Sequence, residues 1–291
     1  MMTRLDAPDP ARMVAMVQAA IAEDGARSDA TVAFLDLGER EASATIDIAA
    51  GIALSGIDIA REVFRQIDAS CTFEAPHRDG DRVAAGETIC TIQGRAASIV
   101  AAERTALNFL QHMTGVATLT SRFVDAVAGT GVVILDTRKT IPLWRELDKY
   151  AVRCGGAQNH RRSLDAMVLV KDNHVRALGG PEALIAHLAA RAADDGFVEV
   201  EVDSMKFLEQ LLAVRVDRIM LDNFTPGQVG DALERVRSVR ATRADKRVEI
   251  EVSGGITLES VRDYALPGVD YISVGAITHS APAASMSLSL R

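Results

Sequence analysis

The hydrophobic pattern of the first hundred residues predicts short strands around one or two helices. Between residues 31 and 100, runs of β-branched and other apolar side chains alternate with turn residues. Apolar residues recur every four positions between 58 and 67, which is the spacing of one helix face. Strands mixed with few helices indicate an α+β domain of about one hundred residues. The predicted strands span 31–37, 44–56, 71–77 and 88–94.

A long helical pattern begins at residue 102 and stops near Gly129. After it the hydrophobic pattern changes. Six short β-branched runs come next, most of them separated by helical patterns. Strands that alternate with helices at this spacing indicate parallel βα units, in an open doubly wound sheet or a barrel. The runs are 132–137, 166–172, 197–203, 218–223, 248–254 and 271–276, and the predicted helices are 181–194, 204–214, 225–240 and 257–265.

The polarity of two of these strands favours a barrel over an open sheet. In the third run Glu199 and Glu201 share one face and valines occupy the other, because strand side chains alternate. The fifth run repeats the pattern with Glu249 and Glu251. A parallel sheet covered by helices on both faces is apolar on both faces, whereas the inner face of a barrel can hold a polar ligand. We therefore expect an α/β N-terminal domain followed in the chain by an irregular, open, six-stranded α/β barrel.

Composition and net charge limit the kinds of molecule that the protein can be expected to bind. The chain has 291 residues, of which 48% are hydrophobic and 25% charged, which is ordinary for a globular protein. With 32 Lys and Arg against 40 Asp and Glu, its formal net charge is −8. Nucleic acid and anionic membranes need a basic surface, so we expect neither as a partner. A small basic pocket stays compatible with this balance.

Cysteine usage and the absence of long apolar runs indicate a cytoplasmic protein. The three cysteines, Cys71, Cys90 and Cys154, are odd in number and form no CxxC pair, so neither a disulfide framework nor a zinc site is expected. No run of 18 apolar residues occurs, and the first ten residues are charged and contain proline. We therefore predict no membrane span and no signal peptide.

The predicted strand ends carry most of the candidate chemistry. Active sites of α/β barrels lie at the carboxyl ends of the strands. Taken singly, a basic pair can be a solvated turn, and a lone histidine is more often a packing residue than a catalyst. The convergence of cations, carboxylates and glycines on one rim predicts a site for anions and phosphate, with a helix near Thr257 aiming its free N–H groups at an anion. The rim consists of 136–139, 160–161, 171–174, 201–203, 222–223, 253–255 and Gly275.

Several of these segments resemble quinolinate phosphoribosyltransferase, also called nicotinate-nucleotide pyrophosphorylase (carboxylating). The similarity runs in order from about residue 15 to 285, and its most specific part is the block at 136–161 followed by Lys-Asp-Asn-His at 171–174. Three departures stand out: Ser28 and Leu143 where the family usually has glycine, and Thr114 in place of serine. The matching segments are 23–31, 103–118, 136–161, 168–175, 199–203, 220–224 and 252–257.

The resemblance implies two domains and an assembly. An N-terminal α/β sandwich domain would span 1–115, and the barrel 116–276. The tail at 277–291 would pack back on the sandwich domain. Family members are homodimers in which the arginine at the position of Arg104 enters the active site of the neighbouring subunit.

The resemblance also implies a reaction. The family transfers the phosphoribosyl group of phosphoribosyl pyrophosphate to the ring nitrogen of quinolinate and releases the 2-carboxylate as CO2, giving nicotinate mononucleotide and pyrophosphate for NAD biosynthesis. Two carboxylates, a pyrophosphate and Mg²⁺ define the charges that such a site must meet. The resemblance assigns quinolinate to Arg104, Arg138, His160, Arg161 and Lys171, pyrophosphate to Lys139 and Lys171, the ribose hydroxyls and hydrated Mg²⁺ to Glu201 and Asp222, and the 5′-phosphate to Ser253, Gly254 and Gly275. The rest of the predicted substrate-binding set is Thr137, Gly255, Val274 and Ala276, and the predicted catalytic residues are Lys139, Lys171, Glu201 and Asp222.

Two other functions stay open at this stage. Lys171 at a barrel strand end could serve as the amine nucleophile of a Schiff-base lyase or aldolase. That chemistry gives no role to two adjacent cationic motifs. A nucleotide sensor that keeps the pocket without turnover is the second alternative, and the intact acids Glu201 and Asp222 argue against it.

Overall fold

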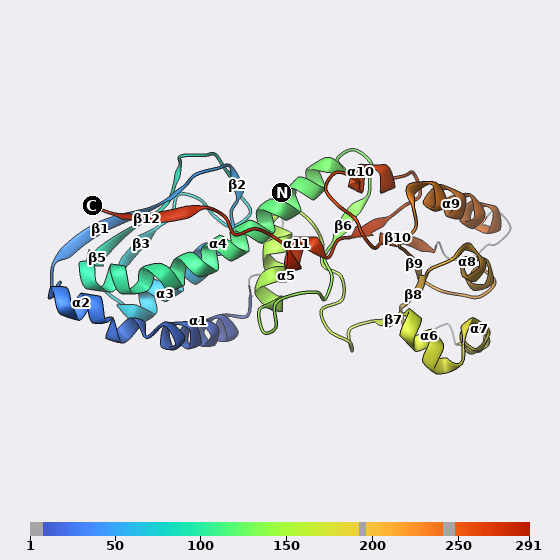
Figure 1. The fold of residues 1–291 in the computed structure, drawn as a ribbon, viewed down its shortest axis with the longest axis horizontal. Coiled ribbons are helices and arrows are strands. Elements are labelled where there is room, and N and C mark those ends of the chain that lie inside the picture. Colours follow the sequence, from blue (N-terminus) through green and yellow to red (C-terminus); the bar gives the residue numbers. More distant parts are fainter. Residues whose placement is uncertain (1–7, 192–195, 241–247) are drawn as a thin grey trace. The chain divides into compact units, whose positions relative to one another are not determined.

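A computed structural model describes residues 8–191, 196–240 and 248–291, and the chain forms two compact units (Figure 1). Unit 1 consists of Met1–Ser121, Thr140–Ala157 and Ile277–Arg291. Unit 2 consists of Arg122–Lys139 and Gln158–Ala276. The contact-based boundary therefore differs from the 115/116 division implied by the resemblance, chiefly because 140–157 belongs to unit 1.

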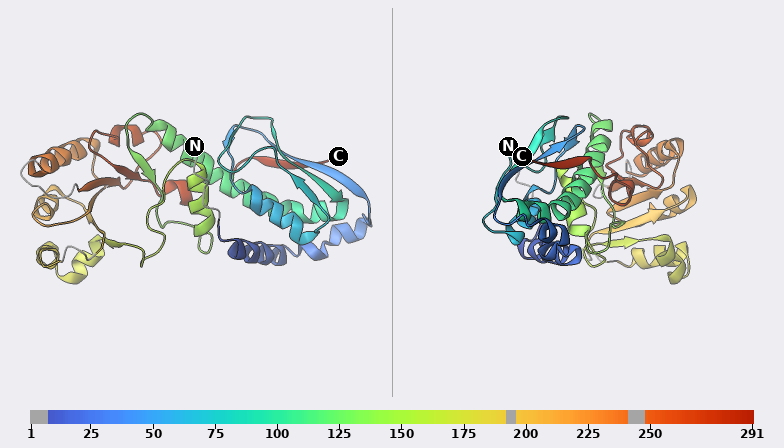
Figure 2. Two further views of the ribbon diagram at one scale, coloured as in Figure 1. Left: turned by 180° about the vertical axis from the view of Figure 1, so that it is seen from behind. Right: turned by 60° about the vertical axis from the view of Figure 1, so that its left-hand side comes forward.

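Unit 1 is an antiparallel sheet with helices along one side (Figures 1 and 2). Its four strands follow the order β12-β1-β5-β3, and a separate pair joins β2 to β4. The C-terminal strand β12 pairs with β1, with Ala44 opposite Leu290. The elements are α1 (Pro10–Asp24), the 3₁₀ turn η1 (Ala26–Ser28), α2 (Ala30–Leu35), β1 (Glu41–Ile48), β2 (Ile52–Ala53), α3 (Ile57–Ile67), β3 (Thr72–Glu74), β4 (Arg82–Val83), β5 (Thr88–Arg95), α4 (Ala96–Ala126, which continues into unit 2), α5 (Arg145–Cys154) and β12 (Met286–Leu290).

Helix caps explain two differences from the predicted elements of unit 1. The strand predicted at 31–37 is wrong, because α2 occupies most of it. The Asp29 carboxylate accepts hydrogen bonds from the Thr31 and Val32 amides, which satisfies the first turn of a helix and outweighs the β-branched content. Helix α1 was not predicted, although Asp9 caps its start and Pro10 occupies its first turn.

The long predicted helix is longer than its pattern indicated. Helix α4 starts at Ala96, directly after β5, and ends at Ala126, three residues before the expected stop at Gly129. Its amino-terminal half packs in unit 1, where Leu107, Leu110 and Met113 are almost fully buried. The segment expected to be a plain connection between 138 and 165 contains helix α5.

Unit 2 confirms the predicted parallel sheet. Six strands follow the order β6-β11-β10-β9-β8-β7, and all of their pairings are parallel. Strands β6 and β7 are the two edges of this order, so the hydrogen-bonded sheet is open among the described strands. The elements are β6 (Val133–Leu135), β7 (Val168–Val170), α6 (Asp172–Leu178), α7 (Pro181–Ala189), β8 (Val198–Val202), α8 (Met205–Leu211), β9 (Arg218–Asp222), α9 (Pro226–Arg240), β10 (Glu249–Ser253), α10 (Val261–Tyr264), β11 (Tyr271–Ser273) and α11 (Ala276–His279).

The two faces of this sheet differ in polarity as the alternation predicted. Val200 and Ile250 are fully buried on one face, and on the other the carboxylates of Glu199 and Glu251 are equally buried. Strands β8 and β10, which flank β9, thus place acids on an inner face that is shielded from solvent. A buried charge requires a partner, so this face has to carry a polar network.

The helix predicted at 257–265 is shorter in the structure and starts later. Helix α10 begins only at Val261 and has four residues, because Thr257 and Ser260 form a turn in which the Thr257 amide donates to Ser260 Oγ. The helix itself starts at Val261, and a single hydrogen-bonded turn, closed by the Val261 amide and the Thr257 carbonyl, precedes it. Residues 192–194 of the helix predicted at 181–194 lie outside the described residues. No helix among the described residues is long and apolar enough to cross a membrane.

Candidate active site

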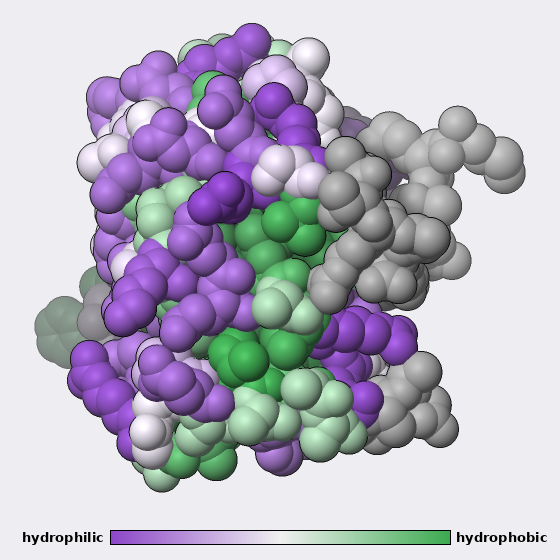
Figure 3. Space-filling view, turned by 90° about the vertical axis from the view of Figure 1, so that its right-hand side faces the viewer, coloured by the Kyte–Doolittle hydropathy of each residue, from purple (hydrophilic) through white to green (hydrophobic). Residues whose placement is uncertain are grey.

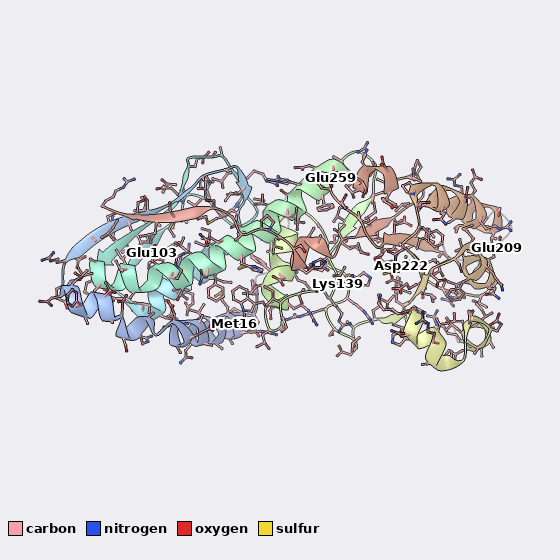
Figure 4. The ribbon with its side chains drawn as sticks, viewed as in Figure 1. Met16, Glu103, Lys139, Glu209, Asp222 and Glu259 are labelled. Atoms are coloured by element: carbon pink, nitrogen blue, oxygen red, sulfur yellow. The ribbon has the colours of Figure 1, made fainter. Side chains whose placement is uncertain are left out.

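A cavity of about 520 Å³ lies at the carboxyl ends of the six parallel strands in unit 2. Every strand or the residues directly after it contribute to the wall, so the sheet curves around one space. Lys139, after β6, and Asp222, at the end of β9, both belong to this wall and lie on the same side of unit 2 (Figure 4). The lining residues are Thr137, Arg138, Lys139, His160, Arg161, Leu169, Lys171, Glu201, Met220, Asp222, Asn223, Ser253, Gly254, Gly255 and Ser273.

Four of the predicted site residues do not line this cavity. Val274, Gly275 and Ala276 follow β11, and the Val274 amide donates to the Leu135 carbonyl at the adjacent strand. Arg104 belongs to unit 1, on α4, where its side chain is 60% exposed and lies 3.9 Å from Glu103. The other eleven predicted residues meet in one cavity, although they come from six separate segments of the chain.

Cations form one part of the cavity wall. Burial lowers the pKa of Arg161. The positive charge of the neighbouring Arg138 side chain lowers it further. The Arg161 guanidinium donates to the Met167 carbonyl, 3.0 Å away, which limits its freedom. Two like charges held this close in a half-buried pocket favour the binding of a compact dianion.

Carboxylates form another part of the cavity wall, in contact with a lysine. The Glu201 carboxylate on β8 lies 2.5 Å from the Lys171 ammonium at the end of β7. Burial and the neighbouring negative charge of Glu201 raise the pKa of Asp222, and the ammonium groups of Lys171 and Lys139 partly offset both effects. Two carboxylate groups at the cavity wall are oxygen donors of the kind that a hydrated divalent cation prefers.

A glycine turn closes the cavity after β10. Gly254 and Gly255 have φ angles of +93° and +63°, a region that L-residues rarely adopt. A Cβ at Gly254 would overlap the Asn223 side chain and lie 2.8 Å from the Asn223 amide nitrogen. The Asn223 amide also donates to the Ser253 carbonyl, so the turns after β9 and β10 are joined.

His160 sits deeper, where both ring nitrogens meet protein groups. Its Nε2 lies 3.2 Å from Glu199 Oε2 and 3.5 Å from Glu251 Oε2. Its Nδ1 accepts a hydrogen bond from the Arg161 amide at 2.8 Å. Burial lowers the pKa of His160, but the two carboxylates outweigh burial and raise it to about 9.

Asp136 anchors the segment that carries His160. Its fully buried carboxylate accepts from the His160 amide at 2.8 Å and from the Asn159 side-chain amide at 2.7 Å. Asp136, at the start of the basic segment 136–139, therefore holds that segment to Asn159 and to the basic pair at 160–161 that follows it.

The oxygen and nitrogen donors of His160, Glu199 and Glu251 lie within 4.8 Å of one another, which makes them a second group able to hold a metal. The Arg218 guanidinium already lies 3.1 Å from Glu251 and supplies the positive charge there. Glu201 and Asp222 line the open cavity and are the better candidates for a hydrated cation.

Asn223 belongs to the rim predicted from the sequence but was given no role there, and Ser273 was not singled out. Asn223 has a left-handed φ of +59°, donates to the Asp222 carboxylate at 2.7 Å and lines the cavity. Ser273 donates to Glu251 Oε1 at 2.6 Å. The alternation of β8 and β10 placed Glu199 and Glu251 on the inner face, but only the fold brings the His160 ring between them.

Both halves of the chain match family models. Residues 29–114 match the N-terminal domain of quinolinate phosphoribosyl transferase, and residues 116–289 match its C-terminal domain. The chain belongs to the quinolinate phosphoribosyltransferase family. A relative from Mycobacterium leprae, a nicotinate-nucleotide pyrophosphorylase [carboxylating], is 44% identical over 78% of each chain. A probable nicotinate-nucleotide pyrophosphorylase of Synechocystis is 33% identical over 93% of this chain and 90% of the relative.

Solved structures of the family have the same fold. The nicotinate-nucleotide pyrophosphorylase of Francisella tularensis superposes with a TM-score of 0.89 at 35% identity, over the full length of both chains. The NadC protein of Streptococcus pyogenes gives a TM-score of 0.87 at 34% identity, over 100% of this chain and 99% of that one. The mixed architecture of an antiparallel sheet unit and a six-stranded parallel unit is thus that of the quinolinate phosphoribosyltransferases.

Proposed function

We propose that this chain transfers the phosphoribosyl group of phosphoribosyl pyrophosphate to quinolinate and decarboxylates the product, in the cavity of unit 2. One observation carries the proposal: the basic and acidic residues that mark the family line a single cavity at the strand ends. The products are nicotinate mononucleotide, CO2 and pyrophosphate. The activity places the enzyme in NAD biosynthesis.

Arg138 and Arg161, with Lys171, bind the two carboxylates of quinolinate. A guanidinium can bond both oxygens of a carboxylate, and one such charge pair at about 4 Å contributes on the order of 4 kcal/mol at an effective dielectric near 20. The lowered pKa of Arg161 beside Arg138 supports this role, because an anion relieves the repulsion between the two side chains. Local charge thus outweighs the formal net charge of −8.

Lys139 and Lys171 meet the pyrophosphate as it leaves. The quinolinate ring nitrogen forms a bond to C1′ of the ribose while the bond from C1′ to the pyrophosphate oxygen breaks, so negative charge grows on the leaving group. Lys139 is exposed at the cavity wall, where its ammonium can follow this charge. Loss of the 2-carboxylate as CO2 leaves an electron pair at carbon 2, which the pyridinium nitrogen stabilises before a proton replaces it.

Glu201 and Asp222 hold the ribose hydroxyls and a hydrated Mg²⁺. The raised pKa of Asp222 next to Glu201 fits this assignment, because a divalent cation would relieve the repulsion between the two carboxylates. Oxygen-only donors with room for water are the ligands that Mg²⁺ prefers. The bound ion would supply positive charge to the pyrophosphate. The same two carboxylates face positive charge that develops on the ribose ring.

The turn at Ser253–Gly255 receives the 5′-phosphate, together with Thr137 and the residues Val274–Ala276 after β11. Both glycines line the cavity: at Gly254 a Cβ would overlap Asn223, and Gly255 has a left-handed φ of +63° that L-residues rarely adopt. The anchor is a turn and not a helix N-terminus, since α10 starts only at Val261.

The active assembly is a homodimer in which Arg104 of one subunit completes the cavity of the other. The exposed guanidinium of Arg104, 3.9 Å from its neighbour Glu103, supports this proposal. An arginine delivered by the partner would add a third guanidinium for the quinolinate carboxylates.

A pyrophosphate-release assay tests the activity. The purified protein is incubated with phosphoribosyl pyrophosphate and quinolinate, nicotinate or no acceptor, each with and without Mg²⁺. We expect release with quinolinate and Mg²⁺ only, with an equal amount of CO2. Release with nicotinate alone, or release that does not depend on an acceptor, would contradict the proposed reaction.

A further inference from the structure

A buried charge network lies on the inner face of the sheet, next to the cavity that His160 lines; burial raises the pKa of Glu199, and contacts with His160 and Arg218 oppose that rise. Glu199 on β8 and Glu251 on β10 are both 0% exposed, and Arg218 on the intervening strand lies 3.1 Å from Glu251 and 3.8 Å from Glu199. The Arg218 guanidinium also stacks over the Tyr271 ring at 4.1 Å and pairs with Glu249 at 2.7 Å. Burying this many charges is expensive unless each one has a defined partner, so the network constrains its members tightly.

His160 is the member of this network that reaches the cavity. Its ring is 6% exposed, and its Nε2 edge faces Glu199 and Glu251 from 3.2 and 3.5 Å. Its backbone amide is held by Asp136. Three ionisable groups contact His160 directly: Asp136 after β6, Glu199 on β8 and Glu251 on β10. Arg218 on β9 acts on the ring indirectly, because it pairs with the two glutamates.

The carboxylates determine which ring nitrogen can respond to a ligand. Two acceptors at Nε2 require a proton there, whether the ring is neutral or positively charged. Nδ1 is then the only nitrogen whose protonation can change. When it is bare it accepts the Arg161 amide at 2.8 Å, and when it is protonated it loses that bond and becomes a donor.

The surroundings place opposite demands on Nδ1. The carboxylates raise the pKa of His160 to about 9, which favours a second proton at neutral pH, whereas the bond from the Arg161 amide needs a bare nitrogen. An anionic oxygen at Nδ1 resolves the conflict, because it accepts the new N–H. The proton comes from solvent.

We propose that Glu199 and Glu251 are positioning residues of the phosphoribosyl-transfer site: they hold His160 by Nε2, so that Nδ1 exchanges the Arg161 amide for a carboxylate oxygen of quinolinate. The inference rests on the proposed function for the identity of the ligand. It assigns the two buried acids a role in quinolinate binding although neither touches the substrate.

Isosteric variants with a matched control test this assignment. Glu199→Gln and Glu251→Gln keep the shape of the side chain and remove its charge. Glu249→Gln is the control, since Glu249 contacts the same Arg218 from the same strand as Glu251 but is not a partner of the His160 ring. We expect the KM for quinolinate to rise about tenfold or more in the two test variants, as when a supporting partner of a ligand is lost, with the KM for phosphoribosyl pyrophosphate unchanged. The control should keep both constants.

The pH profile separates positioning from loss of structure. In the wild type, kcat measured at saturating quinolinate should fall at alkaline pH, near 9, where the complex loses the Nδ1 proton that the two carboxylates favour. In Glu251→Gln this limb should move toward about pH 6.5, the ordinary value for histidine. A variant that is merely unstable would lower activity at every pH without moving the alkaline limb of the profile. If the limb does not move and the KM for quinolinate is unchanged, the proposal is overturned.

A measurement on the wild type keeps the test independent of folding of the variants. The nitrogen NMR spectrum of histidine-labelled protein is recorded with and without quinolinate, and the His160 signals are assigned by their absence in His160→Gln. Quinolinate should convert Nδ1 from a bare to a protonated nitrogen while Nε2 stays protonated. No change at Nδ1 in a protein that makes nicotinate mononucleotide overturns this inference and leaves the proposed function intact, whereas absence of product would refute the function itself.

Discussion

At the scale of single residues, the structure places most of the motif residues together. Arg138, Arg161 and Lys171 were predicted from separate segments, and they line one cavity. What the sequence could not indicate is their support: the pairing of Asp136 with Asn159 joins residues 23 positions apart, and no local pattern encodes it. Long-range hydrogen bonds of this kind depend on the strand order, which the fold alone determines.

Leu143 is a residue-scale departure with a consequence for stability. It has a φ of +68° and is 81% exposed. A left-handed conformation costs a branched residue about 1–2 kcal/mol, whereas glycine adopts it freely. Leu143→Gly should therefore raise the free energy of unfolding by about 0.5–1 kcal/mol after the larger chain entropy of glycine is included, as measured by urea denaturation.

Leu143→Ala is the control for this prediction. It removes the same exposed apolar side chain but keeps a Cβ, so it should leave the free energy of unfolding close to that of the wild type. An equal gain from both variants would show that the exposed side chain, and not the backbone conformation, is responsible.

At the scale of elements, periodicity predicted the strands and helices of unit 2 well, since βα units repeat one simple pattern. It failed where a cap decides the structure. Asp29 starts a helix in a β-branched run, and the Thr257–Ser260 turn delays α10. Helix α5 has a strongly charged sequence whose role emerges only from its contacts in unit 1.

Asp79 joins two helices of unit 1 and should matter for stability. Its carboxylate accepts hydrogen bonds from the Gly56 and Ile57 amides at the start of α3, each at 3.0 Å, and from the Tyr150 hydroxyl on α5 at 2.9 Å. Asp79→Ala leaves three donors in a half-buried or buried setting, so we expect a loss of about 2–3 kcal/mol in the free energy of unfolding.

Tyr150→Phe removes only one of these three bonds and serves as the graded comparison. It should destabilise the fold by about 1 kcal/mol, measured by the same denaturation experiment. A larger loss for Tyr150→Phe than for Asp79→Ala would contradict the assignment of Asp79 as the centre of this network.

At the scale of the whole molecule, charge is segregated. The chain is acidic, with a formal net charge of −8, yet the cavity wall contains Arg138, Lys139, Arg161 and Lys171. The surface of unit 2 seen from α7, α8 and α9 is largely hydrophilic around a band of apolar residues (Figure 3). A dianion would thus meet four cationic side chains in the cavity although the chain as a whole is acidic.

The proposed homodimer gives a whole-molecule prediction. If Arg104 acts in the neighbouring cavity, the Arg104→Ala and Lys171→Ala homodimers are both inactive. A mixed dimer with one subunit of each variant has one complete site, because the Lys171→Ala subunit supplies Arg104 to the intact cavity of the other. Random mixing after reversible dissociation should restore about a quarter of the wild-type rate. Mixtures that stay as inactive as the separate variants would contradict delivery of Arg104 by the partner.

The most direct test of the central claim compares cavity cations with a cation elsewhere in unit 2. Nicotinate mononucleotide formation is measured for Arg138→Ala and Lys171→Ala beside Arg237→Ala, an exposed arginine that donates to the Pro267 carbonyl, with thermal unfolding as the check on folding. Loss of one close charge contact of about 4 kcal/mol predicts a fall in kcat/KM of about a thousandfold in the two cavity variants, and Arg237→Ala should be unaffected. Near-normal turnover in a folded Arg138→Ala or Lys171→Ala protein would contradict the claim that this cavity carries out the reaction.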